Sequence, residues 1–237
     1  ISAARQAGQG TSALEAMTEA ARQPGIDWRS YMQGFLARAA GNSAYDWSRP
    51  ARPPQVRELL GEPAFFAPAR GGHGCNHIAF IGDTSGSIQE PEHRAMLSTL
   101  CEMARDLNPK TITVTWCDDH IQRVDVFDGV PGEDTLVDYY NTNPIPRGGG
   151  TSFIPPFEML DGLKDGSANG IPQAIPNHTI TDLLDAGVPD GAIYFTDLEG
   201  PAPADKPEYP VLWISVQERA RHPWGERVNV DPKEMVG

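Results

Sequence analysis

The chain has 237 residues and a formal net charge of −13, enough for one sizeable hydrophobic core and a small extension. The charge is uneven: residues 1–70 carry eight Lys and Arg against six Asp and Glu, whereas residues 71–237 carry eleven against 26. So acidic a main segment repels phosphate backbones, which argues against nucleic-acid binding and favours cations and basic protein surfaces as partners.

Cysteine content and hydropathy point to a cytoplasmic protein. Three Cys form an odd, sparse set, which argues against a disulfide framework and for a reducing compartment. No run of about 18 apolar residues is present, so no transmembrane helix and no membrane contact are expected. No signal peptide is recognisable. The chain opens on Ile1 rather than Met, and we expect it to be a fragment of a longer protein.

Residues 1–70 are predicted to form a helical extension followed by a wrapping linker. Residues 11–40 have the pattern of two helices, and the second carries an apolar stripe at helical spacing from Trp28 to Ala39. Residues 46–72 are rich in Pro, Arg and Gly. Their aromatic side chains would not stay in water without cost, so this linker is expected to lie on the main domain.

From residue 77 onward, strand and helix patterns alternate, which predicts an α/β fold with a doubly wound, mostly parallel open sheet over residues 71–237. The predicted strands cover residues 77–82, 111–117, 121–127, 191–196 and 211–216. The predicted helices cover residues 88–107, 133–141, 153–163 and 180–186. The last twenty residues are expected to pack back on the sheet.

Oxygen-bearing side chains follow the predicted elements in three separate loops. Asp83, Ser85 and Ser87 follow the first strand, Thr151 ends a run of glycines, and Asp197 follows a late strand. In an open parallel sheet, ligands bind beyond the carboxyl ends of the strands, where the strand order reverses. Mg²⁺ prefers oxygen ligands in octahedral geometry. If the loops converge, we expect a divalent-cation site there.

Each of these residues also has an ordinary structural interpretation. Ser87 is a candidate helix N-cap, with Glu90 completing a capping box. Thr151 is a candidate cap of the following helix, and an Asp such as Asp197 after a strand is commonly a turn residue. The occurrence of all three in this order favours the metal site.

Two other clusters are weaker candidates. Asp118 and Asp119 follow the second predicted strand; they are secondary candidates that tune the metal site, or they simply form the turn. His73, Cys75 and His77 are close enough in sequence to suggest zinc. That set is incomplete, however, and His77 is expected at the far end of its strand from the metal site.

The spacing Asp83-x-Ser85-x-Ser87, with a Thr in a Gly-rich loop and a late Asp, resembles the metal-ion-dependent adhesion site (MIDAS) of von Willebrand factor A (VWA) domains. Within that superfamily the chain is most similar to the bacterial VWA-like domain at the C-terminus of metallopeptidase-type proteins. The supporting segments are Asp83 to Ile88, Gly148 to Phe153, Tyr194 to Asp197, Tyr209 to Trp213 and Trp47 to Pro50. One departure is Leu198, where many members have Gly.

The resemblance implies a ligand set. Ser85, Ser87 and Thr151 would be direct hydroxyl ligands of Mg²⁺, or of Mn²⁺ or Ca²⁺, with Asp83 and Asp197 acting directly or through water. Neutral hydroxyls leave the cation under-neutralised, so an open coordination position would favour a carboxylate from another protein.

We therefore expect a metal-dependent protein-interaction domain and, by family resemblance, an adaptor for an AAA+ ATPase of the MoxR type or its substrate. An enzyme is not expected, because the sequence has no His-Glu-x-x-His motif, no Lys after the glycine loop and no evident Ser-His-Asp set. Two alternatives stay open: a metal-dependent hydrolase of the peptidase type, and a structural domain whose site is empty.

Overall fold

The structure is a computed structural model. It describes residues 28–41, 45–50, 68–70, 75–167, 170–172, 175–217 and 222–231. The first of the two helices predicted within residues 11–40, and most of the predicted linker, lie outside these residues.

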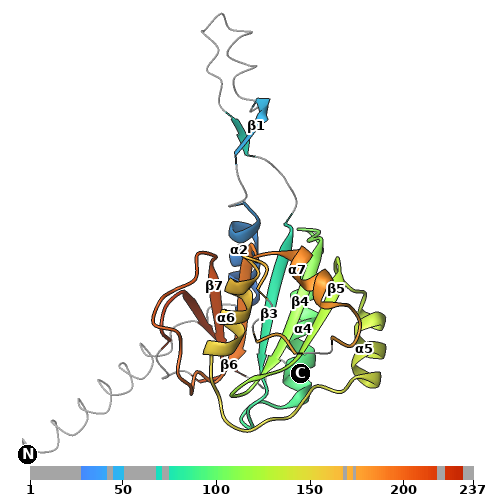
Figure 1. Cartoon of the computed structure of the whole chain (residues 1–237), viewed down its shortest axis with the longest axis vertical. Coiled ribbons are helices and arrows are strands. Elements are labelled where there is room, and N and C mark those ends of the chain that lie inside the picture. The colour runs from blue at the N-terminus through green and yellow to red at the C-terminus, as the bar shows by residue number, and fades with distance from the viewer. Residues whose placement is uncertain are drawn as a thin grey trace, which may run out of the picture.

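A six-stranded sheet forms the centre of the described chain (Figure 1). Its strands are β3 (His77–Asp83), β4 (Thr111–Cys117), β5 (Ile121–Asp128), β6 (Gly191–Thr196), β7 (Val211–Ser215) and β8 (Glu226–Asn229). Their order is β5-β4-β3-β6-β7-β8, and every pair is parallel except β4 with β5. The predicted α/β fold with a mostly parallel open sheet is confirmed.

The order of the strands reverses at β3. The chain passes from β3 to β4 on one side, and later enters β6 on the other side of β3. Ile78 pairs with Gly191 and Gly82 with Phe195, so β3 and β6 run side by side in the same direction and their carboxyl ends are adjacent. This is the position where open α/β sheets bind ligands.

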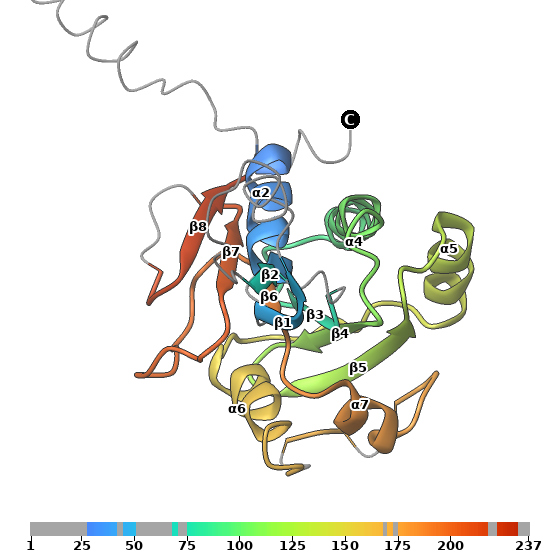
Figure 2. The same cartoon turned by 90° about the horizontal axis from the view of Figure 1, so that it is seen from above.

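Helices cover both faces of the sheet (Figure 2). On one face lie α2 (Trp28–Gly41), α4 (Glu90–Ala104) and α5 (Glu133–Thr142). On the other lie α6 (Ile154–Gly162) and α7 (Ile180–Ala186). Because both faces are covered, the central strands are continuous runs of buried residues: all seven residues of β3 and all six of β6 are buried.

Helix α2 belongs to the core of the domain. Met32 and Phe35 are at most 1 % exposed and lie in the same hydrophobic cluster as residues of β3, β4, β6 and α4. At the outer edge, Tyr31 and Arg38 both donate to the carboxylate of Glu226 in β8, at 2.9 and 2.6 Å. The helix thus holds the outermost strand to the rest of the sheet.

Three strands were not predicted. Strands β1 (Tyr45–Pro50) and β2 (Pro68–Arg70) form an antiparallel pair within the segment interpreted as linker. Strand β8 was expected only as a tail packing on the sheet. It is a short edge strand with the sequence Glu-Arg-Val-Asn, in which one residue is buried, so it carries no apolar pattern that would reveal it.

The start of α4 corrects the predicted capping box. The helix begins at Glu90, and its N-cap is Gln89. The backbone N–H of Gln89 donates to the Glu92 carboxylate at 2.8 Å. Ser87 therefore does not cap this helix with Glu90. Its hydroxyl instead points to Asp197 in the loop that follows β6.

Candidate metal centre

Asp83 ties the ends of the two central strands together. It is the last residue of β3 and is fully buried. One carboxylate oxygen accepts a hydrogen bond from the backbone N–H of Ser85 at 2.9 Å. The other accepts from the hydroxyl of Thr196, the last residue of β6, at 2.6 Å. Thr196 was not among the predicted site residues, although a Thr at the end of an apolar strand was a readable signal.

The hydroxyls and the second carboxylate form a continuous chain of contacts. The Ser85 and Ser87 hydroxyl oxygens lie 2.9 Å apart, and the Ser87 hydroxyl donates to Asp197 Oδ2 at 2.5 Å. The other Asp197 oxygen accepts from the backbone N–H of Glu199 at 2.9 Å, as a turn-forming Asp would. The structure thus brings Asp83, Ser85, Ser87 and Asp197 together at one edge of the sheet.

The glycine loop docks against the two other loops through its backbone. Gly148 N–H donates to the Thr84 carbonyl at 3.1 Å, and Phe153 N–H donates to the Pro201 carbonyl at 2.9 Å. Thr151 lies against Gly200, where an added Cβ would come within 2.9 Å of the Thr151 methyl group. Thr151 is half-buried and does not cap α6, whose N-cap position is Phe153.

Asp118 joins the glycine loop to the β4–β5 turn. Its carboxylate accepts from Gly149 N–H at 3.2 Å, from the Gln122 side chain at 2.6 Å and from His120 N–H at 3.1 Å. Burial raises the pKa of Asp118, but these hydrogen bonds outweigh it and leave the pKa below its usual value. Asp118 therefore forms the turn and also holds the loop that carries Thr151.

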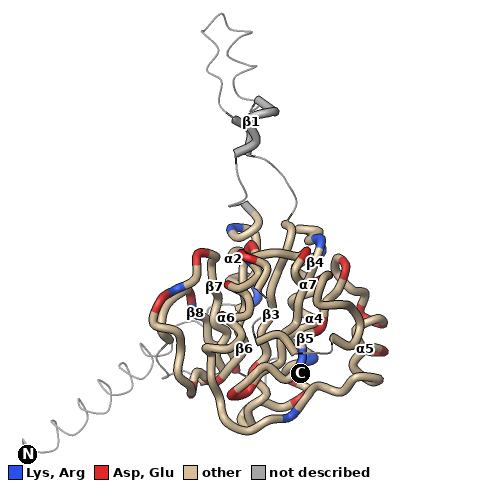
Figure 3. Tube along the Cα trace, viewed as in Figure 1, with Lys and Arg blue, Asp and Glu red and all other residues tan. Residues whose placement is uncertain are grey.

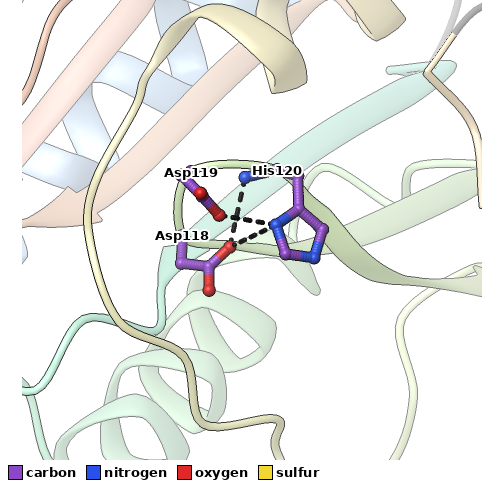
Figure 4. Close-up of side chains that lie close together, drawn as sticks. All are labelled: Asp118, Asp119 and His120. Carbon is purple, nitrogen blue, oxygen red and sulfur yellow. Dashed lines mark hydrogen bonds and ion pairs between the residues drawn. The ribbon is translucent and has the colours of Figure 1, made fainter.

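Asp119 and His120 extend this group into solvent (Figure 4). Ligand atoms of Asp118, Asp119 and His120 all lie within 4.8 Å of one another. His120 Nδ1 is 2.5 Å from an Asp119 oxygen, and this hydrogen bond, followed by the charge of Asp118, raises the pKa of His120. Both outer side chains are about two-thirds exposed, so this cluster lacks the enclosure of the Asp83 group.

The carboxylates of Asp83 and Asp197 are neighbours at the strand ends, and no described Lys or Arg forms a salt bridge with either. Burial raises the pKa of Asp83, and the nearby charge of Asp197 adds to this effect. Buried charges are normally paired or coordinate a metal, so this pair is suited to a cation.

The spacing of the oxygens also suits a small divalent cation. With ligands at roughly 2.0–2.1 Å, neighbouring oxygens of an octahedral Mg²⁺ lie about 2.9 Å apart. The Ser85–Ser87 oxygen distance of 2.9 Å equals this spacing, and the Ser87–Asp197 distance of 2.5 Å is shorter. All the donors are hard oxygens, as Mg²⁺ requires. Both distances are also ordinary O–H···O hydrogen-bond lengths, so the fit to a divalent cation rests on the all-oxygen donor set.

Leu198 shows why glycine is usual after this Asp. Its φ is +66°, in the left-handed region that disfavours a bulky side chain. The side chain is nevertheless only 6 % exposed and packs in the core on the α6 face. Burial of the leucine offsets the backbone cost, so the loop keeps its shape without glycine.

The zinc alternative does not fit the described part of its residues; His73 lies outside them. Both ring nitrogens of His77 are engaged, with the Gly187 carbonyl at 2.7 Å and the Thr113 hydroxyl at 2.8 Å. The Cys75 thiol is also engaged, 3.5 Å from an Asp190 oxygen, and burial together with the charge of Asp190 raises its pKa to about 12.

Comparison with protein families agrees with the fold. Residues 78–169 and 178–231, more than half of the chain, match the family described as "VWA-like domain (DUF2201)". The chain belongs to this family. Residues 1–70 match a second family, described as "Putative metallopeptidase domain". No curated protein matches the chain.

The two matches associate the VWA-like domain with a metal-related function. The boundary between the two matched regions does not separate two packing units. Helix α2 lies within the second match and yet contributes to the core of the VWA-like domain. The predicted boundary at residue 70 stays a prediction. Among the described residues, no helix combines the length and apolar character needed to cross a membrane.

Proposed function

We propose that this VWA-like domain binds a protein partner through a divalent cation, Mg²⁺. Ser85, Ser87 and Thr151 would hold the cation through their hydroxyls, with Asp83 and Asp197 supplying negative charge directly or through water. When bound, the cation supplies a Lewis-acidic position for a carboxylate of the partner. The observation that supports this most strongly is the unbroken series of oxygen contacts from Ser85 to Asp197, beside the buried Asp83, which forms hydrogen bonds but no ion pair with a described Lys or Arg.

The net negative charge of the domain supports a role for the cation in attracting a carboxylate. Acidic residues outnumber basic ones along the described chain (Figure 3), and residues 71–237 carry most of the negative charge. A bound cation would therefore be a local attraction for a carboxylate on an otherwise repelling surface. By family resemblance, we propose a MoxR-type AAA+ ATPase or its substrate as the partner.

The test combines calorimetry and capture. Wild type should bind Mg²⁺, and should retain a purified MoxR-type ATPase in Mg²⁺ but not with EDTA. Asp83→Ala should weaken Mg²⁺ binding by at least about tenfold and abolish capture, because the remaining ligands lose the main buried charge. The matched control is Asp205→Ala, an exposed acidic residue in the same domain. Capture that survives both EDTA and Asp83→Ala would refute the metal-dependent interaction.

A hydrolase is the second candidate, favoured by the match of residues 1–70 to a metallopeptidase-type domain. The sequence present contains no His-Glu-x-x-His motif, and the Asp83 group offers no nucleophile with a positioned base. Peptide turnover by the chain, lost in Asp83→Ala, would establish this second function in place of the first.

A further inference from the structure

A small pocket adjoins the candidate metal centre. It has a volume of about 160 Å³ and lies between the start of α4 and the loop that leads into the glycine run. Its lining includes Ser85, Gln89, Glu90, His93, Ile145 and Arg147. Sites for whole small molecules span roughly 300–1,000 Å³, so this pocket has room for one side chain of a larger ligand.

Ser85 belongs to both the pocket and the candidate metal centre. It lines the pocket, and its hydroxyl oxygen lies 2.9 Å from that of Ser87. In an extended peptide, side chains two residues apart point to the same face and are separated by roughly 7 Å. Because the two sites share a residue, one extended segment of a partner can place one side chain in each.

Arg147 is the charged group of the pocket that is left for a ligand. One oxygen of Glu90 accepts two hydrogen bonds from Arg94, at 3.0 and 2.9 Å, so Arg94 already offsets the charge of Glu90. Arg147 lies 3.9 Å from the other Glu90 oxygen, beyond hydrogen-bond distance, and its side chain is 80 % exposed. So long and exposed an ion pair contributes little to stability, and breaking it costs little.

The candidate metal centre affects which charge the pocket favours. Asp83 and Asp197 would repel a second acidic side chain if their charges were not compensated. The two positive charges of a bound Mg²⁺ would equal the negative charges of these two carboxylates. Arg147 would then determine the sign of the attraction in the pocket, which favours a carboxylate.

The buried part of the pocket offers a hydrogen-bond donor as well. His93 lines the pocket, is 2 % exposed and packs edge-on against Trp116 and Phe195, with ring centroids 5.1 and 5.4 Å away. Among the described residues, neither of its ring nitrogens has a well-formed hydrogen bond. An imidazole carries at least one N–H in either protonation state, so His93 can donate to a carboxylate that reaches it.

We propose that this pocket binds a second acidic side chain of the partner, two residues from the one that the metal centre takes, and that Arg147 selects it. An acidic side chain would pair with Arg147, a basic one would be repelled, and an uncharged one would gain no ion pair. The inference rests on the proposed function for the metal-bound acidic residue. The choice of a second acidic residue rests on Arg147 and the pocket.

Three peptides of one design test this preference on the full chain. They are acetyl-X-Ala-Glu-Ala-X-amide with X as Glu, Gln or Lys, so the central Glu is constant and both directions of binding are covered. Titration calorimetry in Mg²⁺ should show that the Glu peptide binds about three- to fivefold more tightly than the Gln peptide, the range of one exposed ion pair, and that the Lys peptide binds most weakly. Tightest binding of the Lys peptide would assign the pocket to Glu90 and overturn the proposal.

Charge reversal at Arg147 decides whether this residue makes the selection. Additional Glu residues also give the metal centre more groups to bind, and only the dependence on Arg147 separates the two effects. Arg147→Glu should make the Lys peptide the tightest and change the Glu-to-Lys affinity ratio at least about tenfold. Arg105→Glu, at an exposed arginine just past the end of α4, makes the same change in net charge and should keep the wild-type ranking. An unchanged ranking in Arg147→Glu would overturn the proposal.

Repeating the titrations in EDTA distinguishes this inference from the proposed function. Both predict that EDTA abolishes peptide binding. Binding that requires Mg²⁺ but ranks the peptides equally in wild type and Arg147→Glu would refute the second acidic residue alone. A preference that persists in EDTA and still depends on Arg147 would refute the metal-dependent interaction and leave the selection by Arg147 standing. Absence of peptide binding with and without Mg²⁺ would refute both.

Discussion

At the scale of single residues, Gly148 sets how closely the glycine loop approaches the rest of the site. A Cβ built on Gly148 would lie 2.0 Å from an Asp118 oxygen, whereas one on Gly149 would meet nothing within 4 Å. The two glycines are adjacent, and the backbone φ of neither is in the left-handed region. They therefore differ in steric room and offer a matched pair of substitutions.

We predict that Gly148→Ala weakens Mg²⁺ binding by at least about tenfold, because the loop that carries Thr151 must move away from Asp118. Gly149→Ala should change the affinity by less than about threefold, the range expected of a surface substitution without contacts. Titration calorimetry with Mg²⁺ compares the two. Equal affinities in both variants would show that Thr151 is not a ligand whose position matters.

His77 gives the fold a dependence on pH at the opposite end of β3. Burial lowers the pKa of His77 to about 4, against a hydrogen bond to Gly187 and the charge of Asp190. In the unfolded chain His77 is protonated below a pKa of about 6.5, whereas in the folded state it stays neutral until the pH approaches 4. The stability contributed by neutral His77 is complete above that pKa and is lost as the pH falls toward 4.

This histidine should account for about 2 kcal/mol of the unfolding free energy lost between pH 7 and pH 5. We predict that His77→Gln, although less stable at neutral pH, loses correspondingly less over that interval in urea unfolding. His222→Gln, at an exposed position, should lose as much as wild type. A slope for His77→Gln as steep as that of wild type would mean that His77 is protonated in the folded state.

At the scale of secondary-structure elements, α2 is expected to fold together with the VWA-like domain, because its residues are part of the same core. Met32 is completely buried in the core on the α4 face, and the neighbouring Gln33 is exposed on the same helix. We predict that Met32→Ala lowers the unfolding free energy by about 2–5 kcal/mol, the cost of a buried cavity of this size.

Gln33→Ala is the control and should stay within about 0.5 kcal/mol of wild type. Urea unfolding followed by tryptophan fluorescence reports on the sheet, because Trp116 lies in β4 and Trp213 in β7. If Met32→Ala left this transition unchanged, α2 would be a separate unit that only rests on the domain.

The strands illustrate which elements a sequence determines locally. The predicted ranges 111–117 and 191–196 coincide with β4 and β6, because strands covered on both faces are short, continuous apolar or β-branched runs. Strand β8 escaped prediction because its four residues carry no apolar pattern; its partners, β7 and the Tyr31 and Arg38 side chains of α2, are brought to it only by the fold. Edge strands of this kind are specified by tertiary contacts.

The same distinction holds within the candidate site. Asp83, Ser85, Ser87 and Asp197 were recognisable because they follow strand ends, and adjacency of β3 and β6 brings them together. His93 was not recognisable. It lies between Glu92 and Arg94 in α4, and nothing in this local sequence marks it as a buried residue.

At the scale of the whole molecule, cation binding should stabilise the fold. A ligand bound only by the folded state adds about 2.7 kcal/mol at a concentration 100 times its dissociation constant. We predict that Mg²⁺ raises the thermal unfolding midpoint of wild type in a concentration-dependent way, and that Ser87→Ala removes the increase. Scanning fluorimetry measures both, and a shift that persists in Ser87→Ala would place the stabilising cation elsewhere, with Asp118, Asp119 and His120 as the next group to test.

The most direct test of the metal centre is a crystal structure of the chain grown with Mn²⁺ and measured at the manganese absorption edge. We predict one strong anomalous peak within coordination distance of the Ser85 and Ser87 hydroxyls, with Thr151 and Asp197 around it. A peak at Asp118, Asp119 and His120 alone, or no peak at the ends of β3 and β6, would contradict it.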